Sequence, residues 1–180
     1  SQALGMVLAD NQLHKRLHVQ EHLKKITVVD TGVKLQVKTF DEGILTGVKL
    51  SGGVMIDELH LLGKVPKAEA VIRQIRGGML PYPEAFLAFV TTQSEDAPAG
   101  VFKAELAKAR AVRDGRLKGR TLPVLYEFPE RMLRNDQWRE KKFWGWVNPN
   151  AGRSISIERL EEDYTDALGK GEGALRGWAS

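Results

Sequence analysis

Two adjacent carboxylates, Asp57 and Glu58, are the side chains of this sequence best suited to chemistry. They follow the apolar run Val54-Met55-Ile56, which predicts a short buried strand that ends in acids. In open parallel sheets, ligands bind beyond the carboxyl ends of the strands. Nucleotide hydrolysis needs one acid to hold Mg²⁺ and a second group to orient or deprotonate the attacking water. We therefore predict that Asp57 serves a metal and Glu58 the water. The alternative is that both acids cap the following helix, whose dipole favours negative charge.

A second apolar run, EAFLAFVTTQ at positions 84–93, ends in the hydroxyl residues Thr91 and Thr92. The alternative to a functional role is that these threonines satisfy local backbone groups at a strand end. Between the two runs, a helical pattern extends from Ala68 to Arg76 and is broken by Gly77-Gly78. Two buried strands joined by a helix predict a parallel crossover.

The flanking segments supply further elements. Residues 10–25 place Leu13 and Leu17 at helical spacing, with Asp10 or Asn11 suited to cap an amphipathic, basic helix. The β-rich stretches ITVV and KLQVKTF flank a turn at 30–32 and predict a hairpin or a pair of short strands. Further along, the pattern predicts a helix over 100–114, a strand at 122–128 and an acidic helix from 157 to 168, followed by a glycine-rich segment. The expected fold class is α/β, with a mainly parallel sheet flanked by helices.

Composition sets broader bounds. A length of 180 residues with 42% hydrophobic content suits one domain with a sizeable core. Without cysteine, neither disulfides nor a thiolate metal site can hold the fold, which suits a reducing cytoplasm. No apolar run approaches the roughly 20 residues that span a bilayer, so no membrane association is expected. The net charge of +4 suits a polyanionic partner such as DNA.

Two clusters have competing interpretations. His14, His18 and His22 would share one face of the predicted helix. This face could bind Zn²⁺, contact phosphates weakly or simply be solvated, and no nearby acid or cysteine completes a tetrahedral metal site. The second cluster contains Trp138, Trp144 and Trp146 among basic residues. It could stack on bases of single-stranded nucleic acid, but a hydrophobic cluster at the edge of the domain is the favoured interpretation.

Three segments in order resemble the large subunit of the terminase of tailed bacteriophages, the motor that packages DNA. LTGVKLSGGVMIDELH at 45–60 resembles its Walker B region, where a strand ends in Asp-Glu and a histidine follows. FLAFVTTQSEDAPAGVFKAELAKARAVRDG at 86–115 resembles its motif III, a strand ending in Thr-Thr, a loop and a long helix. WVNPNAGRSISIERLEEDY at 146–164 resembles the segment that closes the ATPase domain.

The resemblance implies roles for individual residues. Asp57 would coordinate Mg²⁺ through water, and Glu58 would be the catalytic carboxylate. Thr91 and Thr92 would sense bound nucleotide and couple its state to DNA movement. His60 fits the family pattern, although a partly buried structural histidine is an equal alternative. Gln93 departs from the small residue of the family and is assigned only a polar contact near the site.

The resemblance also implies missing parts. No G-x-x-x-x-G-K-[ST] phosphate-binding loop occurs in the sequence, and the family places that loop upstream of everything seen here. We therefore expect residues 1–147 to be a partial ATPase domain of the P-loop NTPase type without its P-loop strand. Residues 148–180 would be a closing segment that leads towards a nuclease domain. ATP and Mg²⁺ would be cofactors of the intact parent protein, and the isolated chain is expected neither to bind ATP tightly nor to hydrolyse it.

Partners follow from the same resemblance. In the host cytoplasm, the parent system would contact double-stranded DNA, the terminase small subunit and the portal protein. Loss of the P-loop strand would leave the FLAFVTT edge unpaired. Because exposed edges invite pairing with another chain, we expect self-association or a local rearrangement at that edge. The competing interpretation is a non-enzymatic module that binds DNA or another packaging protein through the basic helix and the tryptophan-rich segment.

Overall fold

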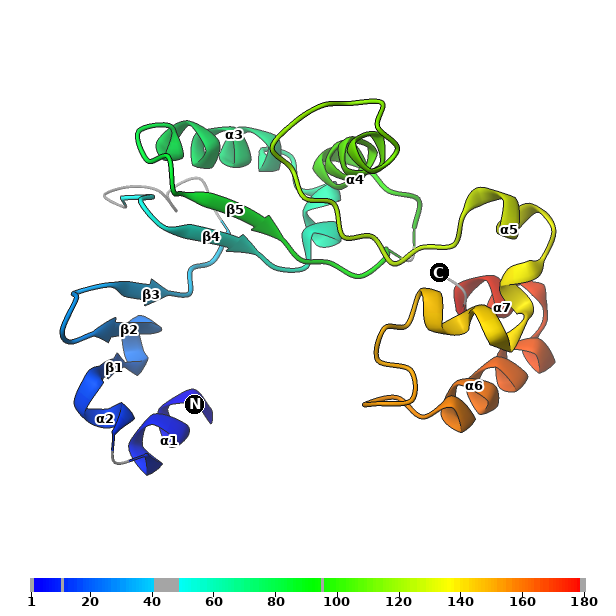
Figure 1. Ribbon diagram of the computed structural model, residues 1–180, viewed down its shortest axis with the longest axis horizontal. Helices are drawn as coiled ribbons and strands as arrows, with labels where there is room; N and C mark the ends of the chain where they lie inside the picture. Colours follow the sequence, from blue (N-terminus) through cyan, green and yellow to red (C-terminus); the bar gives the residue numbers. More distant parts are fainter. Residues whose placement is uncertain (1, 11, 41–48, 95, 179–180) are drawn as a thin grey trace. The chain divides into compact units, whose positions relative to one another are not determined.

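The computed structural model describes the chain except for residues 1, 11, 41–48, 95 and 179–180. Residues 1–50 and 51–180 form two compact units (Figure 1). The chain is a mixed α/β protein that contains a small parallel sheet, which confirms the α/β class. The strand pairing is not mainly parallel as expected, because three of the five described strands pair in an antiparallel sheet. The first four residues of the Walker B-like segment and Glu95 of the motif III-like segment lie outside the described residues.

The first unit is built around a small antiparallel sheet. Its strands are β1 (Leu17–Gln20), β2 (Lys25–Val28) and β3 (Lys34–Gln36), in the order β1-β2-β3. The expected hairpin is confirmed, because β2 and β3 pair across a turn that contains Gly32. At a φ of 67°, Gly32 adopts the left-handed conformation that glycine tolerates best, and its N–H donates to the Val28 carbonyl at 2.8 Å. The remaining elements are α1 (Gln2–Ala9), α2 (Leu13–Arg16) and the short 3₁₀ helix η1 (Glu21–Leu23).

The single helix expected over residues 10–25 is wrong. The helical turn α2 ends at Arg16, and the chain continues as β1, η1 and the start of β2. Strand pairing explains the difference, since Leu17 lies opposite Val28 and Val19 opposite Ile26. This period-2 pairing of apolar residues outweighs the weak helical propensity of the local sequence. Asp10 does act as a cap, because its carboxylate accepts the backbone N–H groups of Gln12 and Leu13 at 2.7 and 2.9 Å. Asn11, the other candidate, lies outside the described residues.

The second unit begins with the two strands that the sequence predicts. β4 (Gly53–Ile56) and β5 (Phe86–Phe89) pair in parallel, with Gly53 opposite Phe86 and Ile56 opposite Phe89. The connection contains the 3₁₀ helix η2 (Leu59–Lys64) and helix α3 (Ala68–Met79). The expected parallel crossover is therefore confirmed, as a sheet of two strands among the described residues.

Helix α3 continues through Gly77 and Gly78, where the sequence predicted a break. Its buried residues are spaced as one helical face and include Met79 at 9% exposure, one turn beyond Ile75. Burial of Met79 offsets the roughly 1 kcal/mol that each helical glycine costs relative to alanine. α3 and the helix α4 (Gly100–Arg113) lie on the same side of the β4–β5 pair (Figure 1). On the opposite face, Met55 and Phe86 remain 68% and 60% exposed. The expectation of two buried strands is therefore wrong, because Ile56 is the one buried residue of β4 and β5 has none.

Residues 122–128 run extended without strand pairing, so the strand expected there is not formed among the described residues. Exposure nevertheless alternates from 122 to 127, since Leu122, Val124 and Tyr126 are exposed and the residues between them are half-buried, and the segment ends at the buried Phe128. The segment is held to α4 by ion pairs of Glu127 with Arg110 and Arg113. Charge pairing with the helix thus replaces a backbone ladder as its anchor.

The remaining elements surround a hydrophobic cluster. They are α5 (Glu130–Arg134), η3 (Gln137–Arg139), η4 (Lys141–Trp146), α6 (Ile157–Lys170) and α7 (Glu172–Trp178). The buried members of this aromatic cluster, as we call it, are Phe128, Met132, Trp138, Trp144, Leu160, Ala167 and Leu175, with Tyr164 and Trp178 packed against them. Burial of Trp138 and Trp144 confirms the favoured hydrophobic interpretation for these two residues, whereas Trp146 is 50% exposed and lies outside the cluster.

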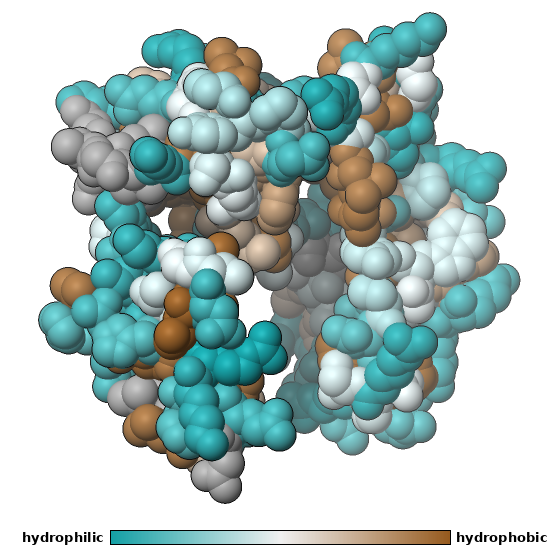
Figure 2. Space-filling view, turned by 60° about the vertical axis from the view of Figure 1, so that its left-hand side comes forward, coloured by the Kyte–Doolittle hydropathy of each residue, from teal (hydrophilic) through white to brown (hydrophobic). Residues whose placement is uncertain are grey.

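The face drawn in Figure 2 is mostly hydrophilic. On the face in Figure 2, apolar side chains form separate brown groups among hydrophilic ones. Among the helices of the described residues, none combines the length and the apolar character that crossing a membrane requires.

Candidate functional site

The carboxyl ends of β4 and β5 meet at one edge of the parallel pair. The Val90 N–H donates to the Ile56 carbonyl at 2.9 Å, and the Leu59 N–H donates to the Val90 carbonyl at 3.3 Å. These bonds extend the pairing past both strands. They place Asp57 and Glu58 beside the end of β5, where Thr91 and Thr92 follow. The four predicted site residues are therefore brought to the same edge, and all four are exposed.

The backbone at Glu58 is unusual. Its φ and ψ of 52° and 48° lie in the left-handed region, which costs a residue with a Cβ roughly 1–2 kcal/mol. Its N–H donates to the Asp57 carboxylate at 3.0 Å. Strain of this kind is concentrated at functional sites. The conformation turns the chain directly after the strand and leaves the Glu58 carboxylate 49% exposed.

The two acids make no capping hydrogen bond to η2. Glu58 occupies the cap position but makes no side-chain hydrogen bond to the helix. The first N–H groups of η2 are bound instead by the end of β5, with Leu59 donating to the Val90 carbonyl and His60 to the Thr91 hydroxyl. Neither carboxylate therefore makes the side-chain hydrogen bond of a cap, although both acids lie at the start of η2, where the helix dipole favours negative charge.

Thr91 and Thr92 differ in how their hydroxyls are used. The Thr91 hydroxyl accepts the His60 backbone N–H at 3.1 Å, contacts the His60 ring at 3.0 Å and donates to the Thr92 carbonyl at 2.8 Å. Thr91 therefore satisfies local groups, as the alternative interpretation expects. The Thr92 hydroxyl makes no hydrogen bond to another described residue, so it is the one available to a ligand. Gln93 is also exposed.

His60 lies at the centre of this arrangement and is partly buried, as the structural alternative for this histidine expects. Its Nδ1 lies 3.2 Å from a Glu58 carboxylate oxygen, and its side chain is only 18% exposed. The ring meets Phe102 edge-on, with centroids 6.4 Å apart. His60 follows Glu58 by two residues, and the left-handed turn at Glu58 brings the two side chains together. This spacing is the sequence feature that could have indicated their contact.

The segments that leave the site are packed closely. η2 follows the acids, and α4 follows the threonine loop. At their contact, a Cβ added to Gly63 would lie 2.8 Å from the Ala99 carbonyl oxygen, and one added to Gly100 would lie 2.4 Å from the Gly63 carbonyl oxygen. Lys64 also pairs with Asp96 of the threonine loop. The hydrogen bond from Lys64 lowers the pKa of the Asp96 carboxyl, with the lysine charge acting in the same direction.

The arrangement suits a hydrated divalent ion better than a fully protein-bound one. Within the part of the chain that the structure describes, no group of three or more His, Cys, Asp or Glu side chains could hold a metal. Mg²⁺ keeps several waters and commonly takes one or two carboxylates together with substrate phosphates. Asp57 and Glu58 fit that limited requirement. A phosphate-binding loop is the component that the sequence lacks.

The histidine cluster does not form. His14 lies in α2, His18 in β1 and His22 in η1, so the three share no helical face. The His14 ring is within 3.1 Å of the Asp10 carbonyl oxygen. The expectation of one helical histidine face, and with it the zinc and phosphate alternatives that rested on that face, is therefore wrong.

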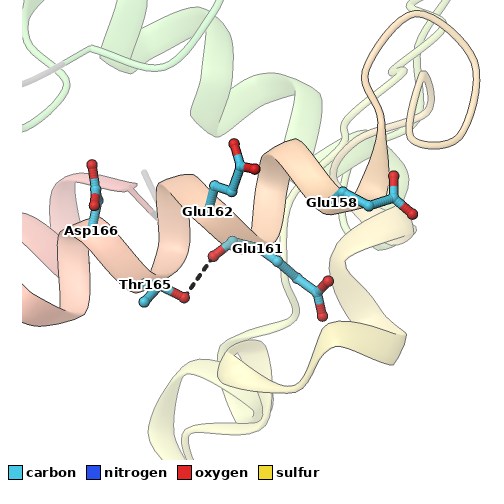
Figure 3. Close-up of a pocket in the computed structure, with 5 residues that line it drawn as sticks. All are labelled: Glu158, Glu161, Glu162, Thr165 and Asp166. Carbon is cyan, nitrogen blue, oxygen red and sulfur yellow. Dashed lines mark hydrogen bonds between the residues drawn. The ribbon is translucent and has the colours of Figure 1, made fainter.

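A shallow hollow on α6 lies outside the strand-end residues (Figure 3). It is lined by one face of that helix, with Glu158, Glu161, Glu162, Thr165 and Asp166. The Thr165 hydroxyl donates to the Glu161 carbonyl at 2.8 Å, and the Glu161 carboxylate pairs with Lys141 at 2.5 Å. The acids point outwards from a single helix, which is typical of a solvated face.

No family model, curated protein or solved structure matches this chain. The resemblance to terminase large subunits therefore rests on the three sequence segments. The geometry of the strand ends is an independent observation on the same residues.

Proposed function

We propose that this chain contributes part of the ATPase site of a terminase large subunit, the DNA-packaging motor of tailed bacteriophages. The observation that supports the proposal best is the placement of Asp57-Glu58 and Thr91-Thr92 at the joined ends of two parallel strands. The order of a strand, two acids, a crossover helix and a threonine-ended strand is that of the resembled motifs. Neither carboxylate makes a capping hydrogen bond to η2, so both are available for this role.

The proposed roles follow from exposure and hydrogen bonding. Asp57 would hold Mg²⁺ through water, and the ion would neutralise charge on the phosphates. Glu58 would orient the attacking water and accept its proton. The Thr92 hydroxyl would meet the nucleotide, whereas Thr91 would connect the two strand ends. The ATP phosphates themselves need a backbone nest and a lysine, which these 180 residues lack.

A P-loop supplied by residues outside this sequence would complete the site. The P-loop strand would then cover the edge of β5 that has no partner among the described residues. Without that strand, we expect weak Mg-ATP binding and self-association through the open edge. Calorimetry and sedimentation of the chain alone would check both, since low-micromolar ATP binding or a strict monomer at high concentration would contradict these expectations.

The decisive experiment is Mg-ATP hydrolysis by the chain extended upstream through the predicted P-loop. Glu58→Gln should lower kcat by about 10²–10⁴-fold, the usual range for a general base. Glu84→Gln is the matched control, because Glu84 is an exposed acid in the turn before β5. Equal activity in both variants would remove Glu58 from the mechanism, and an inactive extended chain would count against the ATPase proposal as a whole.

The competing function, a DNA-binding module, is favoured by one feature of the first unit. Cross-strand pairing aligns His18, Thr27 and Lys34 on one face of the sheet, with Lys25 on the same face. Basic residues on a sheet face can contact phosphates. This function predicts that the chain binds a short DNA duplex, that the affinity falls as salt is added, and that the double variant Lys25→Ala/Lys34→Ala no longer binds. A DNA-binding module of this kind would need no P-loop upstream of the chain.

A further inference from the structure

We propose that His60 is a positioning residue that holds the Glu58 carboxylate against the end of β5, with the proton of its neutral ring on Nδ1. The inference rests on the proposed function only for its kinetic consequence, because the hydrogen-bond pattern is independent of what Glu58 does. Three contacts carry it. They join Nδ1 to Glu58, Nδ1 to the Thr91 hydroxyl, and the His60 N–H to the same hydroxyl.

The Thr91 hydroxyl determines the direction of these bonds. A hydroxyl has one hydrogen to donate and two lone pairs that accept. Its hydrogen is directed to the Thr92 carbonyl, which can only accept. The Thr91 oxygen must therefore accept from both the backbone N–H and the ring nitrogen of His60.

The same reasoning applies to Glu58. An ionised carboxylate only accepts hydrogen bonds. Nδ1 thus faces two acceptors, the Glu58 oxygen at 3.2 Å and the Thr91 oxygen at 3.0 Å. Only a protonated Nδ1 satisfies them, so the neutral ring is the Nδ1–H tautomer. Nε2 makes no hydrogen bond to another described residue.

The ring is held well enough to act as a support. His60 is fixed through its backbone N–H to Thr91 and packs edge-on against Phe102 of α4. Its side chain is 18% exposed, whereas the carboxylate that it holds is 49% exposed. An exposed glutamate samples several rotamers. A bond from a fixed donor selects among them, which is what alignment of a water molecule requires.

The tautomer can be measured on the chain as it is. Long-range ¹H–¹⁵N correlation spectra above the usual histidine pKa distinguish the two neutral tautomers, and loss of one set of signals in His60→Asn assigns the ring. We expect His60 to be protonated on Nδ1, unlike histidine in water, which favours Nε2–H. Thr91→Val should shift this ring towards Nε2–H, whereas Thr91→Ser and Thr92→Val should leave it unchanged. An Nε2–H ring in the unaltered chain, or a ring indifferent to Thr91→Val in a folded protein, would overturn the inference.

Kinetics of the upstream-extended chain separate the two nitrogens. An asparagine side chain places its N–H near the position of Nδ1, and a glutamine places it near Nε2. We expect His60→Asn to keep kcat within about threefold, and His60→Gln and His60→Ala to lose about 10–100-fold, a range typical of supporting residues. Equal losses in the Asn and Gln variants, with hydrolysis still dependent on Glu58, would refute the positioning role alone. An extended chain without hydrolysis would refute the proposed function and leave the tautomer assignment standing on its spectra.

Discussion

The strand-end site and the aromatic cluster differ in how far their side chains are exposed to solvent. At the site, Asp57, Glu58 and Thr92 are exposed, and Glu58 has left-handed backbone angles. In the cluster, Trp144 is 2% exposed and lies within about 5 Å, centroid to centroid, of both Tyr164 and Trp178. The exposed acids and hydroxyls of the candidate site therefore lie on loops with little cover, whereas close packing is concentrated in the aromatic cluster. Connecting segments of this kind are where binding residues are commonly carried.

The largest effect is expected from Trp144→Ala. Trp144 packs against Tyr164 and Trp178, and its indole N–H donates to the Trp138 carbonyl at 3.2 Å. Truncation of a buried tryptophan should lower the free energy of unfolding by about 3–5 kcal/mol, as measured by urea denaturation followed by circular dichroism. Trp146→Ala is the matched control, because Trp146 is 50% exposed, and it should cost about 1 kcal/mol or less. Similar losses in the free energy of unfolding for the two variants would mean that burial in the aromatic cluster is not the main source of stability.

The next largest loss of stability is expected where η2 and α4 pack together beside the candidate site. Gly100 has a φ of 47° and has no room for a Cβ, whereas Gly115 has a φ of 71° and open space around it. Gly115→Ala should therefore cost only the roughly 1–2 kcal/mol of a left-handed residue. Gly100→Ala should cost about 2–4 kcal/mol, because overpacking against the Gly63 carbonyl is added. The difference between their midpoints in thermal unfolding measures that close approach, and equal values would show that η2 and α4 are not in tight contact.

A smaller and pH-dependent effect is expected at Glu127. Burial raises the pKa of this carboxyl, but hydrogen bonds from Arg110 and Arg113, together with their charges, leave the pKa below its ordinary value. The stabilisation is therefore complete above the ordinary glutamate pKa and is lost as the pH falls through the lower pKa of the folded state. Glu127→Gln should cost about 1–2 kcal/mol at neutral pH, since both arginines are partly exposed.

The matched control for Glu127→Gln is Glu130→Gln. Glu130 pairs with Arg134 on an exposed helix turn, with both side chains about three-quarters exposed. Such a pair is worth about 0.3–0.5 kcal/mol. Urea unfolding over a series of pH values from neutral to acid should show the cost of Glu127→Gln shrinking as the pH falls through the lowered pKa of Glu127 in the folded state. A cost that persists in acid would mean that packing, not charge, anchors residues 122–128.

The smallest effect on the free energy of unfolding is expected at Glu58, where a substitution can stabilise the protein instead of destabilising it. Glu58→Gly removes a carboxylate from the proposed site and also relieves a left-handed residue. We expect the free energy of unfolding to stay unchanged or to rise by up to about 1 kcal/mol, because relieved strain is partly offset by the greater backbone entropy of glycine. Asp57→Gly, with no such strain to relieve, should be neutral or destabilising. A clear loss of stability in Glu58→Gly would show that the carboxylate itself supports the fold.

Local sequence patterns predicted several elements correctly. The apolar runs that became β4 and β5 and the helix α4 were found in the sequence, as was the hairpin around Gly32. The helix expected over residues 10–25 failed because cross-strand partners of Leu17 and Val19 lie several residues further along the chain. The strand expected at 122–128 failed because a strand needs a partner with a free edge, and α4 supplies ion pairs instead.

The residues of the candidate site could be predicted from the sequence, but the hydrogen bonds between them could not. Asp57, Glu58, Thr91 and Thr92 each end an apolar run, so their presence at one edge followed from parallel pairing. The contact of His60 with both Glu58 and Thr91 depends on the left-handed turn at Glu58. Sequence patterns do not indicate a strained residue without glycine, and so the contacts of the histidine were not predicted.

All four tryptophans of the chain lie between positions 138 and 178, and Trp138, Trp144 and Trp178 belong to the aromatic cluster. Intrinsic fluorescence therefore reports on one part of this protein and is blind to the strand-end site. Unfolding followed by tryptophan emission and by far-ultraviolet circular dichroism gives two curves, which coincide only if the whole chain melts as one cooperative unit. Because the indole rings all lie in one part of the chain, a comparison of the two curves shows whether the aromatic cluster and the strand-end site unfold together.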